Sequence, residues 1–459
     1  MHKSFIIVIA FSALLLLGCD SGKESKMTFT GEKNEVKLMT LDPGHFHAAL
    51  VQKKMYDQVD TKVHVYGPEG SDIEDHINRI NGFNNREENP TNWELVVYRG
   101  EDYLDKMISE RPGNVMVTAG RNRDKTKYIK TAIDAGINVL ADKPMCINKE
   151  GYELLKDAFD VAQEKEVLLY DIMTERYEIT TILQKELANT PEVFGDLVPG
   201  TPEDPAVTKE SVHHFFKYVS GNPIKRPVWY FDTTQQGEGI VDVATHLVDL
   251  IQWECFPQVI VKETDVSMIS AKRWPTMVTR EQFETVTREP AFPEFLKEHV
   301  VDDQLRVYSN GEFIYTLKGI HAKVSVIWNY EAPEGAGDTH FSIMRGTKAN
   351  VLIKQGKEQS YKPKLYVESL TTDPQFETHL QEAIARLQET YPGIELQKTD
   401  SLWHIKIPQD YRVGHEAHFG QVTEKYLQYL VEGELPDWEV PNMLTKYYTT
   451  TLALETASK

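Results

Sequence analysis

Short apolar strand candidates alternate with helix candidates over residues 36–171 of this 459-residue chain, and this alternation constrains the fold most strongly. The strand candidates are 36–41, 62–66, 93–98, 114–118, 139–141 and 167–171. The helix candidates are 48–56, 102–109, 125–134 and 152–164. Strands that are separated by helices pair in parallel through βαβ units. This part of the chain therefore predicts a doubly wound parallel sheet.

The remainder of the chain predicts a second domain, because 459 residues exceed what one hydrophobic core usually holds. Its strand and helix candidates are 305–353, 376–391, 416–432 and 442–458. Apart from the helix candidate 376–391, the segment 361–407 is assigned no role. We predict an α/β fold in which residues 35–175 form the parallel-sheet domain. Residues 176–459 are expected to form an α+β domain with an open, mainly antiparallel sheet.

The first 19 residues predict a lipoprotein signal peptide. Residues 5–17 form an apolar run that is too short to span a membrane and suits a signal-peptide core. The run ends in Leu-Leu-Gly-Cys19, which resembles a bacterial lipobox and implies that Cys19 is lipidated. Residues 20–34 are polar and predict a flexible tether. We expect an extracytoplasmic protein anchored in the bacterial cell envelope by its lipid; the alternative is an uncleaved helix with an incidental cysteine.

The charge of the chain limits its partners. Its 70 acidic residues outnumber 50 Lys and Arg, which gives a formal net charge of -20. Such a surface repels phosphate backbones, so nucleic acid is not an expected partner. A nucleotide cofactor remains compatible, because helix N-termini and loop amides bind phosphate locally. Besides Cys19 the chain has Cys146 and Cys255, and we expect two buried thiols rather than a disulfide.

The loop after the first strand is a candidate ligand site, because doubly wound sheets bind ligands beyond the carboxyl ends of their strands. A dinucleotide fingerprint would place three glycines in this loop. Asp42 and His47 occupy the first and third of these positions, and Gly44 occupies the second. This loop alone is a weak signal for a dinucleotide.

Two further motifs lie far apart in the sequence. Asp142-Lys143-Pro144 follows the fifth strand candidate, and residues 237–249 read Gly-Glu-Gly-Ile-Val-Asp-Val-Ala-Thr-His-Leu-Val-Asp. Together they resemble the Glu-Lys-Pro motif and the Asp-x-Gly-x-His-x-x-Asp motif of the glucose–fructose oxidoreductase and inositol dehydrogenase (Gfo/Idh/MocA) family. The resemblance implies a Rossmann-like N-terminal domain, a C-terminal domain that binds substrate, and a homo-oligomer.

The resemblance also implies the reaction and three catalytic residues. It points to a nicotinamide-dependent oxidoreductase that acts on a hydroxyl of a sugar, glycoside or cyclic polyol. Lys143 and His246 are the implied catalytic pair, which would hold the substrate oxygen and exchange its proton. Asp242 lies four residues before His246, so on a helix the two share one face, and Asp242 is expected to orient the imidazole. The family motif also implies a cis peptide before Pro144.

NAD is the expected cofactor, and NADP is left open. The residues expected at the pyrophosphate are Gly44, His45 and Phe46, and Asn122 is expected near the nicotinamide-side ribose. Asp142, Lys143 and Pro144 are expected at the nicotinamide. Glu69 follows the second strand and could bind the adenosine ribose, which would favour NAD because a carboxylate repels a 2′-phosphate.

The predicted substrate contacts are Arg176, Lys217, Trp229, Asp242 and His246. The alternative for the segment around Lys217 and Trp229 is a core strand with a solvated basic edge. No metal site is predicted, because the adjacent His213 and His214 seldom point together and no His-x-x-x-His spacing is present.

Two other functions stay open at this stage. The first is a redox-neutral glycoside hydrolase that uses bound NAD, with the same Lys143 and His246. The second is a sugar-binding lipoprotein without catalysis, which the altered glycine loop around Gly44 motivates.

Overall fold

The computed structural model describes residues 28–219, 222–399 and 402–459. The predicted signal peptide, Cys19 and most of the predicted tether lie outside these residues. Within them, the strands form a six-stranded sheet, a ten-stranded sheet and a small two-stranded sheet. No helix in this described part of the chain is both long and apolar enough to cross a bilayer.

The N-terminal sheet confirms the predicted doubly wound architecture. Its order is β3-β2-β1-β4-β5-β6, and all its pairs are parallel. The strands are β1 (Leu38–Leu41), β2 (Lys62–Gly67), β3 (Glu94–Arg99), β4 (Val115–Thr118), β5 (Asn138–Asp142) and β6 (Leu169–Ile172). The helices are α1 (His47–Leu50), α2 (Ser71–Asn85), α3 (Tyr103–Glu110), α4 (Asn122–Asp134) and α5 (Lys149–Lys165).

Two helices of this domain differ from the sequence prediction. The helix expected at 48–56 is wrong beyond Leu50, where α1 ends. The carbonyl oxygens of Gln52 and Lys53 instead accept hydrogen bonds from the Trp93 indole and the Arg86 guanidinium, at 2.6 Å each. Helix α2 was missed because its 15 residues are mostly polar, and only Ile73, His76 and Ile80 are buried.

The C-terminal sheet is open and mainly antiparallel, as predicted. Its order is β10-β12-β13-β7-β14-β15-β16-β18-β17, with β11 paired to β12, and only the β7–β13 pair is parallel among the pairs described. Its strands are β7 (Val207–Phe216), β10 (Val266–Thr279), β11 (Val300–Val301), β12 (Gln304–Leu317), β13 (Ile320–Glu331), β14 (Thr339–Arg345), β15 (Ala349–Lys354), β16 (Lys364–Ser369), β17 (Glu395–Lys398) and β18 (Trp403–Lys406). The two-stranded sheet joins β8 (Tyr218–Val219) to β9 (Asn222–Pro223).

The segment 361–407, which had no assigned role, extends one edge of this sheet. It supplies β16, β17 and β18 and the expected helix α10 (Phe376–Thr390). The other helices of this half are α6 (Ile179–Ala188), α7 (Thr233–Gln236), α8 (Ala244–Cys255), α9 (Arg280–Thr287), α11 (His415–Glu432) and α12 (Glu439–Ala457).

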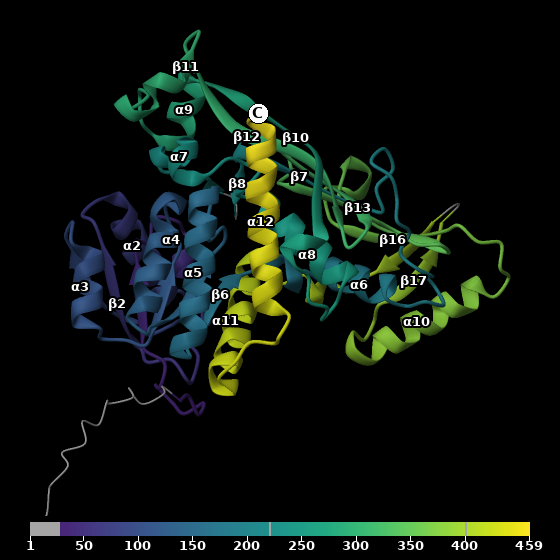
Figure 1. Cartoon of the computed structure of the whole chain (residues 1–459), viewed down its shortest axis with the longest axis horizontal. Helices are drawn as coiled ribbons and strands as arrows, with labels where there is room; N and C mark the ends of the chain where they lie inside the picture. The colour runs from purple at the N-terminus through teal and green to yellow at the C-terminus, as the bar shows by residue number, and fades with distance from the viewer. Residues whose placement is uncertain (1–27, 220–221, 400–401) are drawn as a thin grey trace, which may run out of the picture.

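The last two helices join the halves of the molecule. Helix α12 contacts α5 of the N-terminal domain and also α8 and β10 of the C-terminal half, so it runs through the middle of the molecule (Figure 1). Apolar side chains of α11, among them Phe419 and Tyr426, belong to the hydrophobic core of the parallel-sheet domain. Residues 176–459 are therefore not spatially separate from the N-terminal domain.

Candidate functional site

A cavity of about 500 Å³ lies where the carboxyl ends of the parallel strands meet the second half of the chain. Predicted site residues that line it are His45, Phe46, Asn122, Asp142, Lys143, Lys217, Asp242 and His246. A second cavity of about 260 Å³ is lined by Gly44, Glu69, Arg121 and Trp229. Both cavities share His45 and Phe46, so they adjoin at the first loop of the sheet, and together they are called the elongated groove below.

Lys143 and Asp242 meet in the larger cavity. Strand β5 delivers Lys143, and its peptide bond to Pro144 is cis, as expected. Its Nζ donates to Asp242 Oδ1 at 2.7 Å, and both side chains are about nine-tenths buried. Gln236 Nε2 donates to the other Asp242 oxygen at 3.0 Å. Burial raises the pKa of Asp242, but the Lys143 ammonium outweighs it and holds this pKa below the ordinary value, so the ion pair is maintained.

His246 faces the same cavity from helix α8. Burial, and then the Lys143 charge, lowers the pKa of His246 to about 3, so its ring is neutral near pH 7. Its Nδ1 is buried and has no hydrogen-bond partner among the described residues. The sequence prediction that Asp242 orients His246 is wrong: Asp242 precedes helix α8, which begins at Ala244, and its carboxylate bonds to Lys143 and Gln236 instead.

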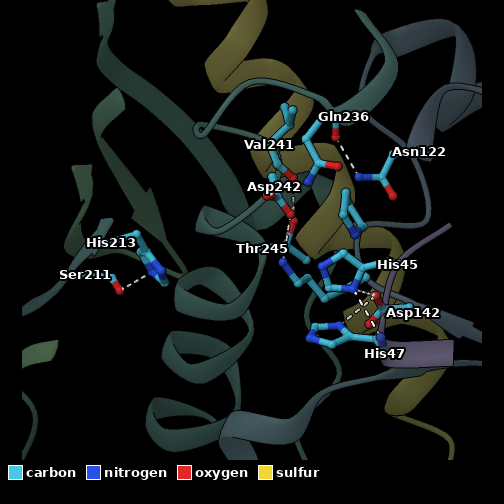
Figure 2. A network of polar contacts seen from close by, with 12 residues as sticks. His45, His47, Asn122, Asp142, Ser211, His213, Gln236, Val241, Asp242 and Thr245 are labelled. Carbon is cyan, nitrogen blue, oxygen red and sulfur yellow. Dashed lines mark hydrogen bonds and ion pairs between the residues drawn. The ribbon is translucent and has the colours of Figure 1, made fainter. Parts of the chain in front are cut away.

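Two histidines, His45 and His47, line the same cavity as the Lys143–Asp242 ion pair. Figure 2 shows the rings of His45 and His47 next to the Asp142 carboxylate at the end of β5. His47 Nδ1 lies 2.9 Å from Asp142 Oδ2, and His45 Nδ1 lies 4.0 Å from the same oxygen. Burial is the main cause that lowers the pKa of both histidines well below the ordinary value. Sequence reasoning missed His47, although its place at the third glycine position was a usable signal.

Lys125 fixes the loop that carries Lys143. It is almost fully buried, and its Nζ donates to Asn122 Oδ1 at 2.5 Å and to the Asp142 and Pro144 carbonyls at 3.0 and 3.2 Å. Burial lowers the pKa of Lys125 to about 8. The Asn122 amide donates to the Gln236 carbonyl at 2.6 Å, which ties helix α4 to the turn before Asp242.

The first loop departs from an ordinary dinucleotide-binding turn. Asp42 has φ +45°, the conformation that a glycine would supply at this position. The backbone N–H groups of Gly44 and His45 donate to the carbonyls of Asp42 and Ala119, at 2.8 and 3.0 Å. These two amides are therefore already used within the protein. A Cβ on Gly120 would lie 2.3 Å from the Asp42 carbonyl oxygen, so the two loops approach as closely as a glycine permits.

The guanidinium of Arg121 lies beside this loop. Arg121 Nη2 lies 2.8 Å from Asp72 Oδ2, and Arg121 Nη1 lies 3.6 Å from Asp42 Oδ1. Its guanidinium also lies over the Trp229 ring, whose Nε1 donates to Asp72 at 3.0 Å. Burial raises the pKa of Asp42 to about 6, although Arg121 opposes the shift. Trp229 thus lines the smaller cavity beside Gly44.

The predicted substrate contacts divide into two groups. Lys217 lines the larger cavity, where it pairs with Asp338. Asp338 also contacts His213 and His214 at 3.0 and 3.3 Å, and His213 Nε2 contacts Ser211 Oγ at 2.7 Å. Ser211 and His213 of this cluster lie across the site from His45 and His47 (Figure 2).

Arg176 lies elsewhere. It does not line either cavity of the described structure and is bound in a buried ion cluster. It donates to both oxygens of Asp249 at 2.7 Å and to Glu439 at 2.8 Å. The location contradicts its predicted role as a substrate contact, and the physical reason is that two buried carboxylates hold the guanidinium in place. Pro144 likewise lies outside both cavity walls, with its carbonyl bonded to Lys125.

Comparisons with known proteins place this site in context. The family model described as "Putative oxidoreductase C terminal domain" matches residues 183–458. The crystal structure of a putative oxidoreductase from Parabacteroides merdae is 57% identical, with 94% of this chain and 99% of that chain covered and a TM-score of 0.92. No curated protein matches the sequence.

Two more distant structures share the fold. Levoglucosan dehydrogenase in complex with NADH is 11% identical, with a TM-score of 0.60 and with 92% of this chain and 97% of that chain covered. A 3-ketoreductase from Actinomadura kijaniata in complex with NADP is 12% identical, with a TM-score of 0.55 and the same two coverages.

Proposed function

Because the chain belongs to the Gfo/Idh/MocA-type oxidoreductases that carry the putative oxidoreductase C-terminal domain, we propose that it oxidises a hydroxyl of a sugar, glycoside or cyclic polyol. The observation that carries this proposal is the Lys143–Asp242 ion pair, which meets the neutral His246 in one buried cavity. A hydroxyl in this cavity would find a cation for its oxygen and an imidazole for its proton.

We also propose that the cofactor is a nicotinamide dinucleotide, which accepts the hydride from the carbinol carbon when it is bound. The elongated groove supports this, since it runs from Glu69 past Gly44 to Lys143 at the carboxyl ends of the strands. Levoglucosan dehydrogenase and the 3-ketoreductase were solved with NADH and NADP. Because the Gly44 and His45 amides are used internally, Arg121 is the group that we expect to neutralise the pyrophosphate.

Lys143, Asp242 and His246 have different roles in the proposed reaction. Lys143 donates a hydrogen bond to the substrate oxygen and stabilises the negative charge that grows on it as the hydride leaves. Asp242 accepts a 2.7 Å hydrogen bond from the Lys143 side chain and aims it at that oxygen. The neutral His246 ring can accept the hydroxyl proton, and its unpartnered Nδ1 marks a polar group that a ligand would satisfy.

The proposal predicts that the purified protein retains its dinucleotide. A lipid anchor on Cys19, which we propose from the sequence, would place the protein outside the cytoplasm, where a free NAD pool is not maintained. We therefore expect about one nicotinamide dinucleotide per chain when natively purified protein is denatured and the supernatant is analysed by mass spectrometry. Recovery of no dinucleotide, together with no binding of added NAD or NADP, would contradict the proposal.

The same protein preparation distinguishes net oxidation of the substrate from redox-neutral hydrolysis. Incubation with a panel of glycosides should give a ketosugar and reduced nicotinamide in equal amounts. Release of the aglycone with no net change in the nicotinamide absorbance would favour the hydrolase instead.

A second prediction concerns pH. Asp42 lies 3.6 Å from Arg121, the group proposed at the pyrophosphate, and burial raises the pKa of Asp42 to about 6, so it is ionised at pH 8 and mostly protonated at pH 5. A dinucleotide repels the ionised form, and by linkage its binding favours the protonated form. Removing one like charge at about 4 Å in a water-like medium is worth about 1 kcal/mol. We therefore expect NAD to bind about fivefold more tightly at pH 5 than at pH 8 in isothermal titration.

The matched variants isolate the contribution of Asp42 to this effect. Asp42→Asn should remove the pH dependence and bind at pH 8 as the wild type does at pH 5, and asparagine tolerates the positive φ at this position. Glu87→Gln, at an exposed site, should keep the wild-type profile. An unchanged pH profile in Asp42→Asn would place the pyrophosphate elsewhere.

A further inference from the structure

We propose that His45, His47 and Asp142 bind one divalent first-row transition metal, such as Zn²⁺, at the floor of the larger cavity. His45 lies in the loop after strand β1, His47 begins helix α1, and Asp142 ends strand β5. One ring nitrogen of each histidine and one carboxylate oxygen of Asp142 all lie within 4.8 Å of one another. Two imidazoles and one carboxylate are a ligand set that Zn²⁺ and Fe²⁺ commonly use, with further positions left for water or substrate.

Two of the three separations between ligand atoms lie near the value that such an ion requires. Metal–nitrogen and metal–oxygen bonds of about 2.0–2.2 Å place neighbouring ligand atoms of a tetrahedral site roughly 3.4 Å apart. The observed separations from Asp142 Oδ2 are 2.9 Å to His47 Nδ1 and 4.0 Å to His45 Nδ1, which bracket this value. His45 Nδ1 also accepts a long 3.3 Å hydrogen bond from the His47 amide, so only a weak contact is lost on metal binding.

The surroundings of the cluster support a cation. The side chains of His47 and Asp142 are 10% and 6% exposed, and His45 is 19% exposed, so the ligands are held in a wall and not on a mobile surface. The nearest lysines are already engaged: Lys143 pairs with Asp242, and Lys125 bonds to backbone carbonyls. Among the described residues, the side-chain partners of the Asp142 carboxylate are the two imidazoles.

The position of the cluster indicates what a metal would do. All three ligands line the cavity that also contains Lys143 and His246, so an open coordination position would face the substrate. A sugar hydroxyl could replace water at that position, and the metal would then share with Lys143 the task of stabilising the oxygen as its charge develops. This role rests on the proposed oxidoreductase function, whereas binding of the metal does not.

Metal binding is tested on the protein as purified. The protein is dialysed against a chelator, then titrated with Zn²⁺ by calorimetry and with Co²⁺ by absorbance spectroscopy. We expect one equivalent of Zn²⁺ and a visible Co²⁺ spectrum typical of nitrogen and oxygen ligands. His47→Ala and Asp142→Asn should each weaken Zn²⁺ binding by at least tenfold, and His45→Ala should do the same.

His404→Ala is the matched control, because His404 lies on β18, far along the other sheet, and stacks on Tyr366. It should bind metal as the wild type does. Circular dichroism and thermal unfolding would show which variants remain folded, and any one folded ligand variant decides the test. Absence of stoichiometric binding to the wild type, or equal binding in the folded ligand variants, would overturn the proposal.

NAD binding, measured in parallel on chelated and metal-loaded protein, separates this proposal from the proposed function. Protein that binds NAD but no metal would refute the metal site alone. Protein that binds metal but neither NAD nor NADP would refute the proposed cofactor while the site stands.

Discussion

Replacing Lys143 by methionine is expected to lower kcat by about a thousandfold or more while the bound dinucleotide is retained. Lys143 supplies the cation at the developing oxyanion, and removal of a single such donor typically costs about 10²–10³ in kcat. Its carboxylate partner, Asp242, is then left buried without its cation, which adds to the loss. The measurements are the steady-state rate on the best glycoside and the dinucleotide content of the purified variant.

Two variants separate chemistry from folding in this experiment. The double variant Lys143→Met with Asp242→Asn removes both charges, so it should recover stability but not activity. Lys149→Met is the matched control, because Lys149 is 59% exposed and pairs only at 3.3 Å with Glu455. Its rate should stay within about twofold of the wild type, as is usual for exposed sites. A Lys143→Met enzyme that is folded and retains a tenth of the activity would contradict the role of Lys143.

The largest effect on stability is expected from Asp249→Ala. Asp249 lies one turn after His246 on helix α8 and accepts hydrogen bonds from Arg176 and from Lys446 at 2.9 Å. These cations are almost fully buried, and they hold the pKa of Asp249 below its ordinary value against the opposing effect of burial. Breaking a buried pair in this way leaves uncompensated charge and costs about 3–5 kcal/mol. The free energy of unfolding in urea should fall by that amount.

An exposed ion pair provides the comparison. Glu377 contacts Lys398 at 3.0 Å, and the two side chains are 47% and 60% exposed. Glu377→Ala should change the free energy of unfolding by about 0.5 kcal/mol or less. If Asp249→Ala and Glu377→Ala cost the same, the buried ion cluster does not stabilise the fold more than an exposed ion pair does.

The parallel sheet was predictable because its evidence is local. Each strand from β1 to β6 is a short apolar run between turn signals, and the predicted runs match the observed strands closely. Helix α2 was not predictable, because three buried side chains among 15 residues give almost no periodic signal. Helix α1 ends early for a tertiary reason, since Trp93 and Arg86 take the carbonyls that would have continued it.

The residues of the site that belong to a sequence motif could be predicted. The contacts between residues that are distant in sequence could not. The two motifs predicted that Lys143, Asp242 and His246 share one site, and all three line the larger cavity. The same motifs could not show that Asp242 bonds to Lys143 instead of His246, because that depends on where helix α8 begins. The clustering of His47 with Asp142 spans 95 positions in sequence, and that of Lys217 with Asp338 spans 121.

The central claim is that a substrate hydroxyl, held at Lys143, passes its carbon-bound hydrogen to a dinucleotide in the groove. The most direct test is a single turnover with a glycoside deuterated at its ring carbinol carbons, followed by mass spectrometry of the dinucleotide released on denaturation. The account predicts that the reduced dinucleotide carries one deuterium in the wild type and none in Lys143→Met. A wild-type enzyme that forms product while its dinucleotide stays free of deuterium would contradict it.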